Sequence, residues 1–149
     1  MMNQEASLDL KDLEVENPFR VGAVVADRYE IQGFLGVGSA GTVFRVVDLT
    51  LDGEVCALKL LHPQQSQDDT RLGRFRNEVI LARKLGHKNI ARTFEFGSAG
   101  NGYFYITMEY LPSGNLSHLI RGGKDPELDL KARLSILKEI AEGIAYAHD

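Results

Sequence analysis

The chain has 149 residues, of which 44% are hydrophobic and 26% are charged, the balance of a single soluble globular domain. Its net charge of −4 argues against a nucleic-acid-binding protein, because such proteins usually carry a basic excess on one face. The one cysteine, Cys56, excludes an intrachain disulfide and fits a reducing cytosol. No apolar run approaches the roughly 20 residues of a membrane-spanning helix. We therefore expect a cytoplasmic protein with no nucleic-acid partner and no membrane segment in this chain.

The first 27 residues read as an acidic leader. Within residues 1–18, five acidic side chains accompany a single lysine, and the leucines fit neither a clean strand nor a strong helix. The first residues carry no basic region and no apolar stretch, so they do not form a secretory signal. We interpret the leader as a mobile tail, with a docking peptide as the alternative.

From Arg28 onward, β-branched residues and short turns predict consecutive strands. Asp52-Gly53 is a hairpin signal, and short connections between neighbouring strands indicate antiparallel pairing. The fold class is therefore α+β, with an antiparallel sheet of about five strands and one packed helix. The expected elements are strands over 29–35, 42–47 and 54–61, a helix over 70–85, strands over 90–96 and 103–110, a short helix over 115–120 and a long helix over 129–148.

A glycine-rich segment, Gly36-Val37-Gly38-Ser39-Ala40-Gly41, lies between the first two strands. Glycines at this spacing let backbone N–H groups approach phosphate oxygens without a Cβ in the way. A dinucleotide-binding oxidoreductase is disfavoured, because a β-branched strand instead of a helix follows Gly41 and Glu54 opens a strand instead of ending one. No Gly-Lys-Ser/Thr sequence follows the glycines, so the segment is not a P-loop of the Walker type. A glycine-rich hairpin without a ligand stays open as the alternative.

Two charged residues occur in apolar surroundings. Lys59 lies within the strand 54–61, where an unpaired buried ammonium would be costly, although a lysine on an edge strand can also serve to discourage aggregation. Glu78 is bracketed by the apolar positions of the 70–85 helix, so its carboxylate needs a partner unless it is solvated. Lys59 and Glu78 are the obvious candidates to pair with each other.

The glycine-rich hairpin, the strand lysine and the helix glutamate occur in the order of the protein kinase signature. The chain resembles a bacterial-type serine/threonine protein kinase. The segments Arg28-Tyr29-Glu30-Ile31 and Arg74-Phe75-Arg76-Asn77-Glu78 are typical of that group. The resemblance implies a kinase N-lobe and hinge over residues 28–111, with one regulatory helix, and the truncated start of a helical C-lobe over 112–149. It also implies an enzyme that binds ATP with magnesium and phosphorylates a protein substrate.

The resemblance assigns roles to individual residues of this sequence. Gly36, Gly38 and Gly41 would cover the ATP phosphates, and Lys59, fixed by Glu78, would hold the α- and β-phosphates. We expect no metal ligand among the residues of this chain. The residues expected around the adenine are Leu35, Val43, Ala57 and Leu116, with Met108 as gatekeeper and Glu109, Tyr110 and Leu111 as the hinge, whose backbone at Glu109 and Leu111 would bond the adenine edge.

The resemblance stops before the residues of phosphoryl transfer. The family's catalytic loop, H-R-D-x-x-x-x-N, and its D-F-G do not occur in these 149 residues. The terminal Tyr146-Ala147-His148-Asp149 matches the end of the helix before that loop, so Asp149 is not expected to be a catalytic base. We therefore expect the chain alone not to transfer phosphate. A pseudokinase-like module that binds nucleotide or a partner protein without chemistry is the alternative.

Overall fold

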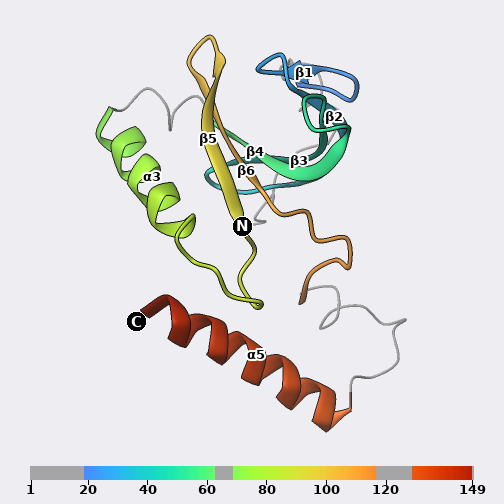
Figure 1. The fold of residues 1–149 in the computed structure, drawn as a ribbon, viewed down its shortest axis with the longest axis vertical. Coiled ribbons are helices and arrows are strands. Elements are labelled where there is room, and N and C mark those ends of the chain that lie inside the picture. The colour runs from blue at the N-terminus through green and yellow to red at the C-terminus, as the bar shows by residue number, and fades with distance from the viewer. Residues whose placement is uncertain (1–18, 63–68, 117–128, 149) are drawn as a thin grey trace, which may run out of the picture.

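The computed structural model describes residues 19–62, 69–116 and 129–148, which form one curled six-stranded sheet and two helices (Figure 1). The strand order is β1-β2-β3-β4-β6-β5, and every neighbouring pair is antiparallel. The predicted α+β class is confirmed, with six strands in place of about five. The elements are β1 (Val24–Val25), β2 (Tyr29–Val37), β3 (Gly41–Asp48), β4 (Glu54–Leu61), α3 (Asp69–Ala82), β5 (Thr93–Gly100), β6 (Tyr103–Met108) and α5 (Leu130–His148).

Tight turns connect two of the hairpins. The predicted turn between β3 and β4 contains Asp52 and Gly53, whose φ angles are 50° and 80°. Asn101 and Gly102, between β5 and β6, have φ angles of 50° and 78°. Positive φ at both central residues suits the right-handed twist of a hairpin and favours Asp, Asn and Gly. Turn chemistry at these two places is therefore readable directly from the sequence.

The first described residues belong to the sheet, within the stretch 1–27 that the sequence assigns to an acidic leader. Val25, in β1, is 1% exposed, and Phe19 packs against the hydrophobic core. Residues from Phe19 onward thus belong to the fold and not to the leader. The sequence did not predict β1, because a two-residue strand is too short to show a hydrophobic period. Residues 1–18 lie outside the described residues.

One face of the sheet carries the hydrophobic core. Along β3 and β4, alternate side chains point to opposite faces, so Phe44, Leu58 and their alternating neighbours are buried together. Burial raises the pKa of the Cys56 thiol to about 11, which keeps the thiol neutral near pH 7. The members of the core are Val25, Tyr29, Ile31, Phe44, Val46, Cys56, Leu58, Leu60 and Tyr105.

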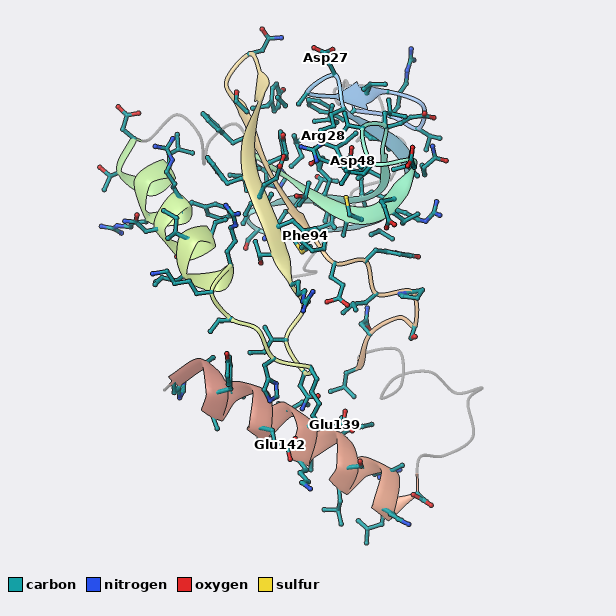
Figure 2. The ribbon with its side chains drawn as sticks, in the orientation of Figure 1. Asp27, Arg28, Asp48, Phe94, Glu139 and Glu142 are labelled. Carbon is teal, nitrogen blue, oxygen red and sulfur yellow. The ribbon has the colours of Figure 1, made fainter. Side chains whose placement is uncertain are left out.

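A polar network lies beside this core, around Arg28 and Asp48 (Figure 2). Arg28 donates to both carboxylate oxygens of Asp48, at 2.6 to 3.0 Å, and to Glu95 at 3.2 Å. The hydroxyls of Tyr29 and Tyr105 each donate to Oε1 of Glu95 at 3.0 Å. The hydrogen bonds from Arg28 lower the pKa of Asp48 to about 2, and burial raises the pKa of Tyr105 to about 12. Four strands, β2, β3, β5 and β6, are therefore tied together by charge-assisted and hydroxyl hydrogen bonds.

Helix α3 lies beside β5 (Figure 1) with its predicted apolar side toward the sheet. Val79 is 5% exposed, and Leu72, Phe75 and Ala82 are half-buried. These positions recur at the helical period of 3.6 residues, which is why the sequence predicted both the helix and its inward side. The prediction over 70–85 is confirmed, with the regular helix ending at Ala82.

Helix α5 is held by the segment that leads into β5. The Asn89 side chain donates from Nδ2 to the backbone carbonyl of Glu139 at 2.8 Å. Lys88 lies 3.8 Å from the Glu142 carboxylate. Gly143 is buried against this segment, since an added Cβ would lie 3.3 Å from the Asn89 carbonyl oxygen. The hydrogen bond between Asn89 and Glu139 joins residues 50 positions apart and fixes the helix relative to the sheet.

The remaining sides of α5 are open. This helix carries an apolar stripe that is exposed. The short helix expected over 115–120 lies mostly within 117–128, outside the described residues. The exposed stripe comprises Leu130, Leu134, Leu137, Ala141 and Ile144.

Candidate functional site

Strands β2 and β3 form the predicted glycine-rich hairpin. Gly36 pairs with Val43, and the Gly38 N–H donates to the Gly41 carbonyl at 2.9 Å. A Cβ at Gly41 would collide with the backbone carbonyl of Leu60, so the pairing of β3 with β4 itself requires a glycine there. At Gly36 and Gly38 an added Cβ would meet nothing within 4 Å. Packing therefore explains one of the three glycines and leaves open space beside the other two.

Antiparallel pairing gathers four of the predicted site residues, Val43, Ala57, Lys59 and Met108, on one face of the sheet. Directly paired residues on neighbouring strands present their side chains on the same side. This face is opposite to the hydrophobic core, because its members alternate with the core residues along β3 and β4. Two cross-strand rows result, one made of Val43, Lys59 and Ile106, the other of Arg45, Ala57 and Met108.

Lys59 and Glu78 stand apart in this structure. Lys59 is half-buried on the shared face, whereas Glu78 is exposed on α3. No ion pair joins them in the part of the chain that the structure describes. Successive residues of a helix are rotated by about 100°, and Val79, the next residue, is the one that α3 buries most deeply. This rotation explains why the Glu78 carboxylate does not face the sheet.

The segment predicted to be the hinge begins directly after β6. The Glu109 N–H donates to the Arg92 carbonyl at 2.8 Å, and the Arg92 N–H donates to the Glu109 carboxylate at 3.1 Å. These reciprocal bonds fix Glu109 against the segment before β5. The Glu109 carbonyl and the Leu111 N–H, which are the groups expected to bond an adenine edge, have no hydrogen-bond partner among residues 19–62, 69–116 and 129–148.

Of the other predicted residues, Tyr110 contacts this face through Arg45. Tyr110 is half-buried beneath Arg45, whose guanidinium carbon lies 5.7 Å from the centre of the ring. Leu35, Leu111 and Leu116 come from three separate segments and expose between 41% and 58% of their surface. The three leucines that the sequence predicts around an adenine ring are thus exposed in this structure.

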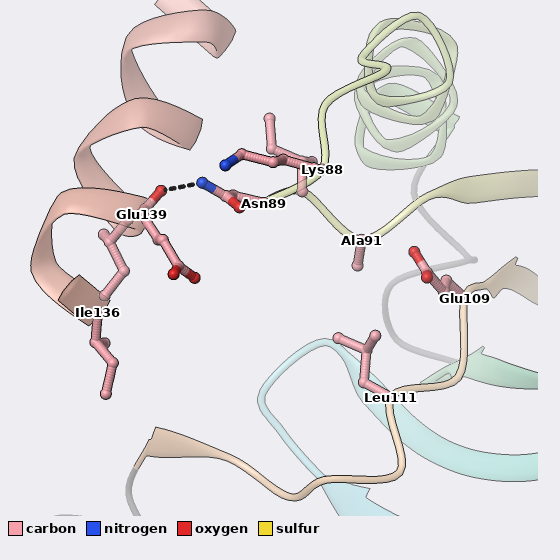
Figure 3. A pocket seen from close by; sticks show the side chains of 9 residues that line it. Lys88, Asn89, Ala91, Glu109, Leu111, Ile136 and Glu139 are labelled. Atoms are coloured by element: carbon pink, nitrogen blue, oxygen red, sulfur yellow. Dashed lines mark hydrogen bonds between the residues drawn. The ribbon is translucent and has the colours of Figure 1, made fainter. Parts of the chain in front are cut away.

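A pocket of about 290 Å³ lies between the hinge and α5 (Figure 3). It shares Glu109 and Leu111 with the predicted nucleotide site but contains none of the glycines, nor Lys59. It is therefore a separate space from the face that carries Val43 and Ala57. Its lining residues are Lys88, Asn89, Ile90, Ala91, Glu109, Leu111, Ile136, Glu139 and Ile140.

Sequence reasoning missed four residues of this region. Arg45 and Ile106 could have been found by strand alternation, since they lie two positions from Val43 and from Met108. Asn89 lies in His87-Lys88-Asn89-Ile90, a segment typical of the kinase group, but its contact with α5 was not predicted. His62, whose ring nitrogen Nε2 lies 3.1 Å from the Gly38 carbonyl oxygen, left no recognisable pattern in the sequence. Contacts made across 24 and 50 positions of the chain are set by packing alone.

The family described as protein kinase domain matches residues 29–149, which contain the glycine-rich hairpin, Lys59, Glu78 and the hinge. This chain belongs to the protein kinase domain family. The kinase sequence is 34% identical over 128 residues to the serine/threonine-protein kinase PrkC of Bacillus subtilis (strain 168), which covers 86% of this chain and 19% of that protein. It is 30% identical over 128 residues to the serine/threonine-protein kinase pkn3 of Myxococcus xanthus, with 86% of this chain and 23% of that protein covered.

The fold comparison agrees. The crystal structure of the Mycobacterium tuberculosis PknI kinase domain matches this kinase chain with a TM-score of 0.68 and 27% identity, over 87% of this chain and 51% of that chain. The chain thus spans about half the length of that kinase domain and about a fifth of the curated relatives. The curated relatives that it matches are named serine/threonine-protein kinases. No helix in the described part of the chain combines the length and the apolar character that crossing a membrane requires.

Proposed function

We propose that this chain is the ATP-binding portion of a serine/threonine protein kinase that phosphorylates protein hydroxyl groups. The observation that carries the proposal is the single face of the sheet on which Val43, Ala57, Lys59 and Met108 lie next to the hinge. Apolar side chains, the cations Lys59 and Arg45, and hinge backbone groups converge there. This is the chemistry that an adenine ring bearing phosphates requires.

The glycines of the β2–β3 hairpin fit a phosphate chain. Neither Gly36 nor Gly38 has a positive φ, and a Cβ at either position would meet no atom within 4 Å. The fold of the protein therefore does not itself demand glycine at these two positions. A phosphate group placed close to the backbone would demand it, because a side chain would then occupy its space.

The adenine end is supported by the free groups of the hinge. The Glu109 carbonyl and the Leu111 N–H offer one acceptor and one donor, which match the polar edge of an adenine. Leu35 and Leu116 would lose exposed apolar surface against the ring. At roughly 25 cal/mol for each Å² buried, such contacts supply a large share of nucleotide affinity.

We further propose that rotation of α3 regulates the nucleotide pocket. Glu78 is exposed in this structure, and a rotation of α3 about its axis would bring its carboxylate toward Lys59. The pair would then orient the Lys59 ammonium toward the α- and β-phosphates. Rotation of a helix against a sheet is a known form of regulatory transition.

The chemistry beyond binding depends on residues that these 149 positions do not contain. A magnesium ion would neutralise charge on the phosphates. Within residues 19–62, 69–116 and 129–148, no group of three or more His, Cys, Asp or Glu side chains is placed to hold a metal ion. We therefore propose that the chain alone binds ATP without transferring phosphate. Incubation with labelled ATP and a generic protein substrate, giving turnover above that of Lys59→Ala, would contradict this.

The decisive experiment measures ATP binding to the chain by calorimetry and by thermal shift. We expect ATP to raise the unfolding temperature, and Lys59→Ala to weaken ATP binding by at least tenfold, since a charge-assisted contact to phosphate is removed. Lys131→Ala is the matched control, because Lys131 is an exposed lysine of α5 remote from the face. Equal weakening in both variants, or no binding of ATP by the unmodified chain, would refute the proposed pocket.

A second candidate is a kinase-like module that binds a partner protein. The exposed apolar stripe of α5, represented by Leu134, Leu137 and Ile144, favours it. The two candidates differ in one measurement. Retention of ATP affinity assigns the nucleotide role, whereas loss of all nucleotide binding together with self-association through α5 assigns the interaction role.

A further inference from the structure

The turn of the glycine-rich hairpin is held from outside by one residue of the next hairpin. His62 is the first residue after β4, three positions beyond Lys59. Its ring nitrogen Nε2 lies 3.1 Å from the Gly38 carbonyl oxygen, and its backbone N–H donates to the Ala40 carbonyl at 3.2 Å. A single residue thus binds two carbonyls of the turn, once through its ring and once through its backbone.

The direction of the ring contact follows from its chemistry. A backbone carbonyl oxygen can only accept a hydrogen bond, so the His62 ring must donate from Nε2. The neutral tautomer with a proton on Nε2 does this, and so does the imidazolium. The Gly38 carbonyl is therefore drawn toward the end of β4 in both protonation states.

Fixing these carbonyls determines which backbone groups remain available in the turn. The Gly38 N–H is used within the hairpin, where it donates to Gly41. The N–H groups of Ser39 and Ala40 have no acceptor within the described ranges of the chain. Among the described residues, two N–H donors of the turn therefore have no partner, while the carbonyls of Gly38 and Ala40 accept hydrogen bonds from His62.

This arrangement is the one that a phosphate needs. Backbone N–H groups stabilise an anion, whereas a carbonyl oxygen carries partial negative charge and repels it. Donors that are oriented in advance cost no reorganisation when the anion arrives. A turn whose carbonyls were free to rotate would spend part of its time with oxygen facing the phosphates.

We infer that His62 is a positioning residue that holds the turn at Gly38–Gly41 in its phosphate-accepting conformation. The inference rests on the proposed ATP-binding function and adds to it a residue outside the expected site. His62 does not touch the nucleotide itself. It acts through the Gly38 and Ala40 carbonyls, and so it affects only ligands that carry phosphate.

The test compares two ligands and three variants of the 149-residue chain. ATP and adenosine share the adenine and the ribose but differ in phosphate. His62→Ala removes the ring donor and keeps the backbone N–H. His62→Gln supplies a side-chain N–H donor without a titrating charge. His148→Ala, at the end of α5, is the control for loss of a histidine elsewhere.

We expect His62→Ala to weaken ATP binding by about fivefold, which corresponds to one lost hydrogen bond, and to leave adenosine binding unchanged. His62→Gln restores ATP binding to within about twofold of the unmodified chain. In hydrogen exchange without ligand, His62→Ala exchanges faster at Gly38–Gly41 than the control does. This last measurement remains informative even where a variant binds ligand too weakly to measure.

Three results would overturn the inference while leaving ATP binding established. These are unchanged ATP affinity in His62→Ala, an equal loss of adenosine affinity, or failure of His62→Gln to recover. If the unmodified chain binds adenosine but gains nothing from the phosphates of ATP, His62 has no phosphate-accepting turn to hold and the inference also falls. If the unmodified chain binds neither ligand, the proposed function fails first, and the inference fails with it.

Discussion

Asp48 offers a quantitative test of what holds the sheet together. It is 4% exposed and accepts hydrogen bonds from Arg28, as well as from the backbone and hydroxyl of Thr50. These contacts, the Arg28 bonds foremost, lower the pKa of Asp48 from 3.8 to about 2. Because the folded value lies below the unfolded one, the ionised carboxylate stabilises the fold above about pH 4. That stabilisation is lost as the pH falls toward 2.

The size of the effect follows from the shift. One pKa unit corresponds to roughly 1.4 kcal/mol, so the shift of Asp48 amounts to about 2 kcal/mol of folding free energy. Arg28 is partly solvated, with 32% of its side chain exposed. Screening by solvent therefore reduces the free energy that the Arg28–Asp48 contact contributes to folding. We expect Asp48→Asn to destabilise the chain by about 1 to 2 kcal/mol at pH 7.

The assay is urea unfolding of the unmodified chain and of Asp48→Asn between pH 2 and pH 7. The difference in unfolding free energy should be largest at neutral pH and should shrink as the pH falls toward 2, where about half of the native carboxylates are protonated. Asp52→Asn is the control, since Asp52 is an exposed turn residue with φ of 50°, a conformation that Asn adopts readily. A constant difference between Asp48→Asn and the unmodified chain at every pH would refute the electrostatic argument.

Two further predictions concern the nucleotide face and the helix. Arg45→Met removes the cation over the Tyr110 ring and should weaken ATP binding by about two- to fivefold, since a partly exposed cation–π contact contributes roughly 0.5 to 1 kcal/mol. Arg76→Met is the control, because it removes a cation that lies at the same 5.7 Å from the centre of a different ring, that of Phe96. This control variant should leave ATP binding unchanged. Asn89→Ala removes the side-chain donor to the Glu139 carbonyl and should lower stability by about 1 kcal/mol, measured by urea unfolding. Faster hydrogen exchange confined to α5 would confirm the cause. Unchanged exchange in α5 would contradict it.

The regular elements of the fold were predictable because their signals are local. β4 occupies the predicted residues 54–61, and Asp52-Gly53 forms the expected turn with positive φ. The apolar period of α3 placed Val79 and its partners on the buried side. Each of these signals comes from neighbours within about one helical turn or one strand, where backbone geometry alone decides which side chains share a face.

The candidate site was predictable to the extent that strand alternation and the kinase resemblance define it. Alternation places Ala57 and Lys59 on one face, and the observed register adds Val43 and Met108 beside them. The state of the Lys59–Glu78 pair was not predictable. It depends on how α3 is rotated against the sheet, and the same helix sequence is compatible with more than one rotation.

By itself, the sequence determined the α+β class, the glycine-rich hairpin, the segment predicted to be the hinge, and the resemblance to protein kinases, whose motifs occur here in the same order. Tertiary structure alone decided the rest. Arg28 reaches Glu95 across 67 positions, Asn89 reaches Glu139 across 50, and His62 reaches Gly38 across 24. Periodicity carries no information about such pairs. They exist because the packed sheet and helix bring their backbones within hydrogen-bond distance, and that depends on the whole fold at once.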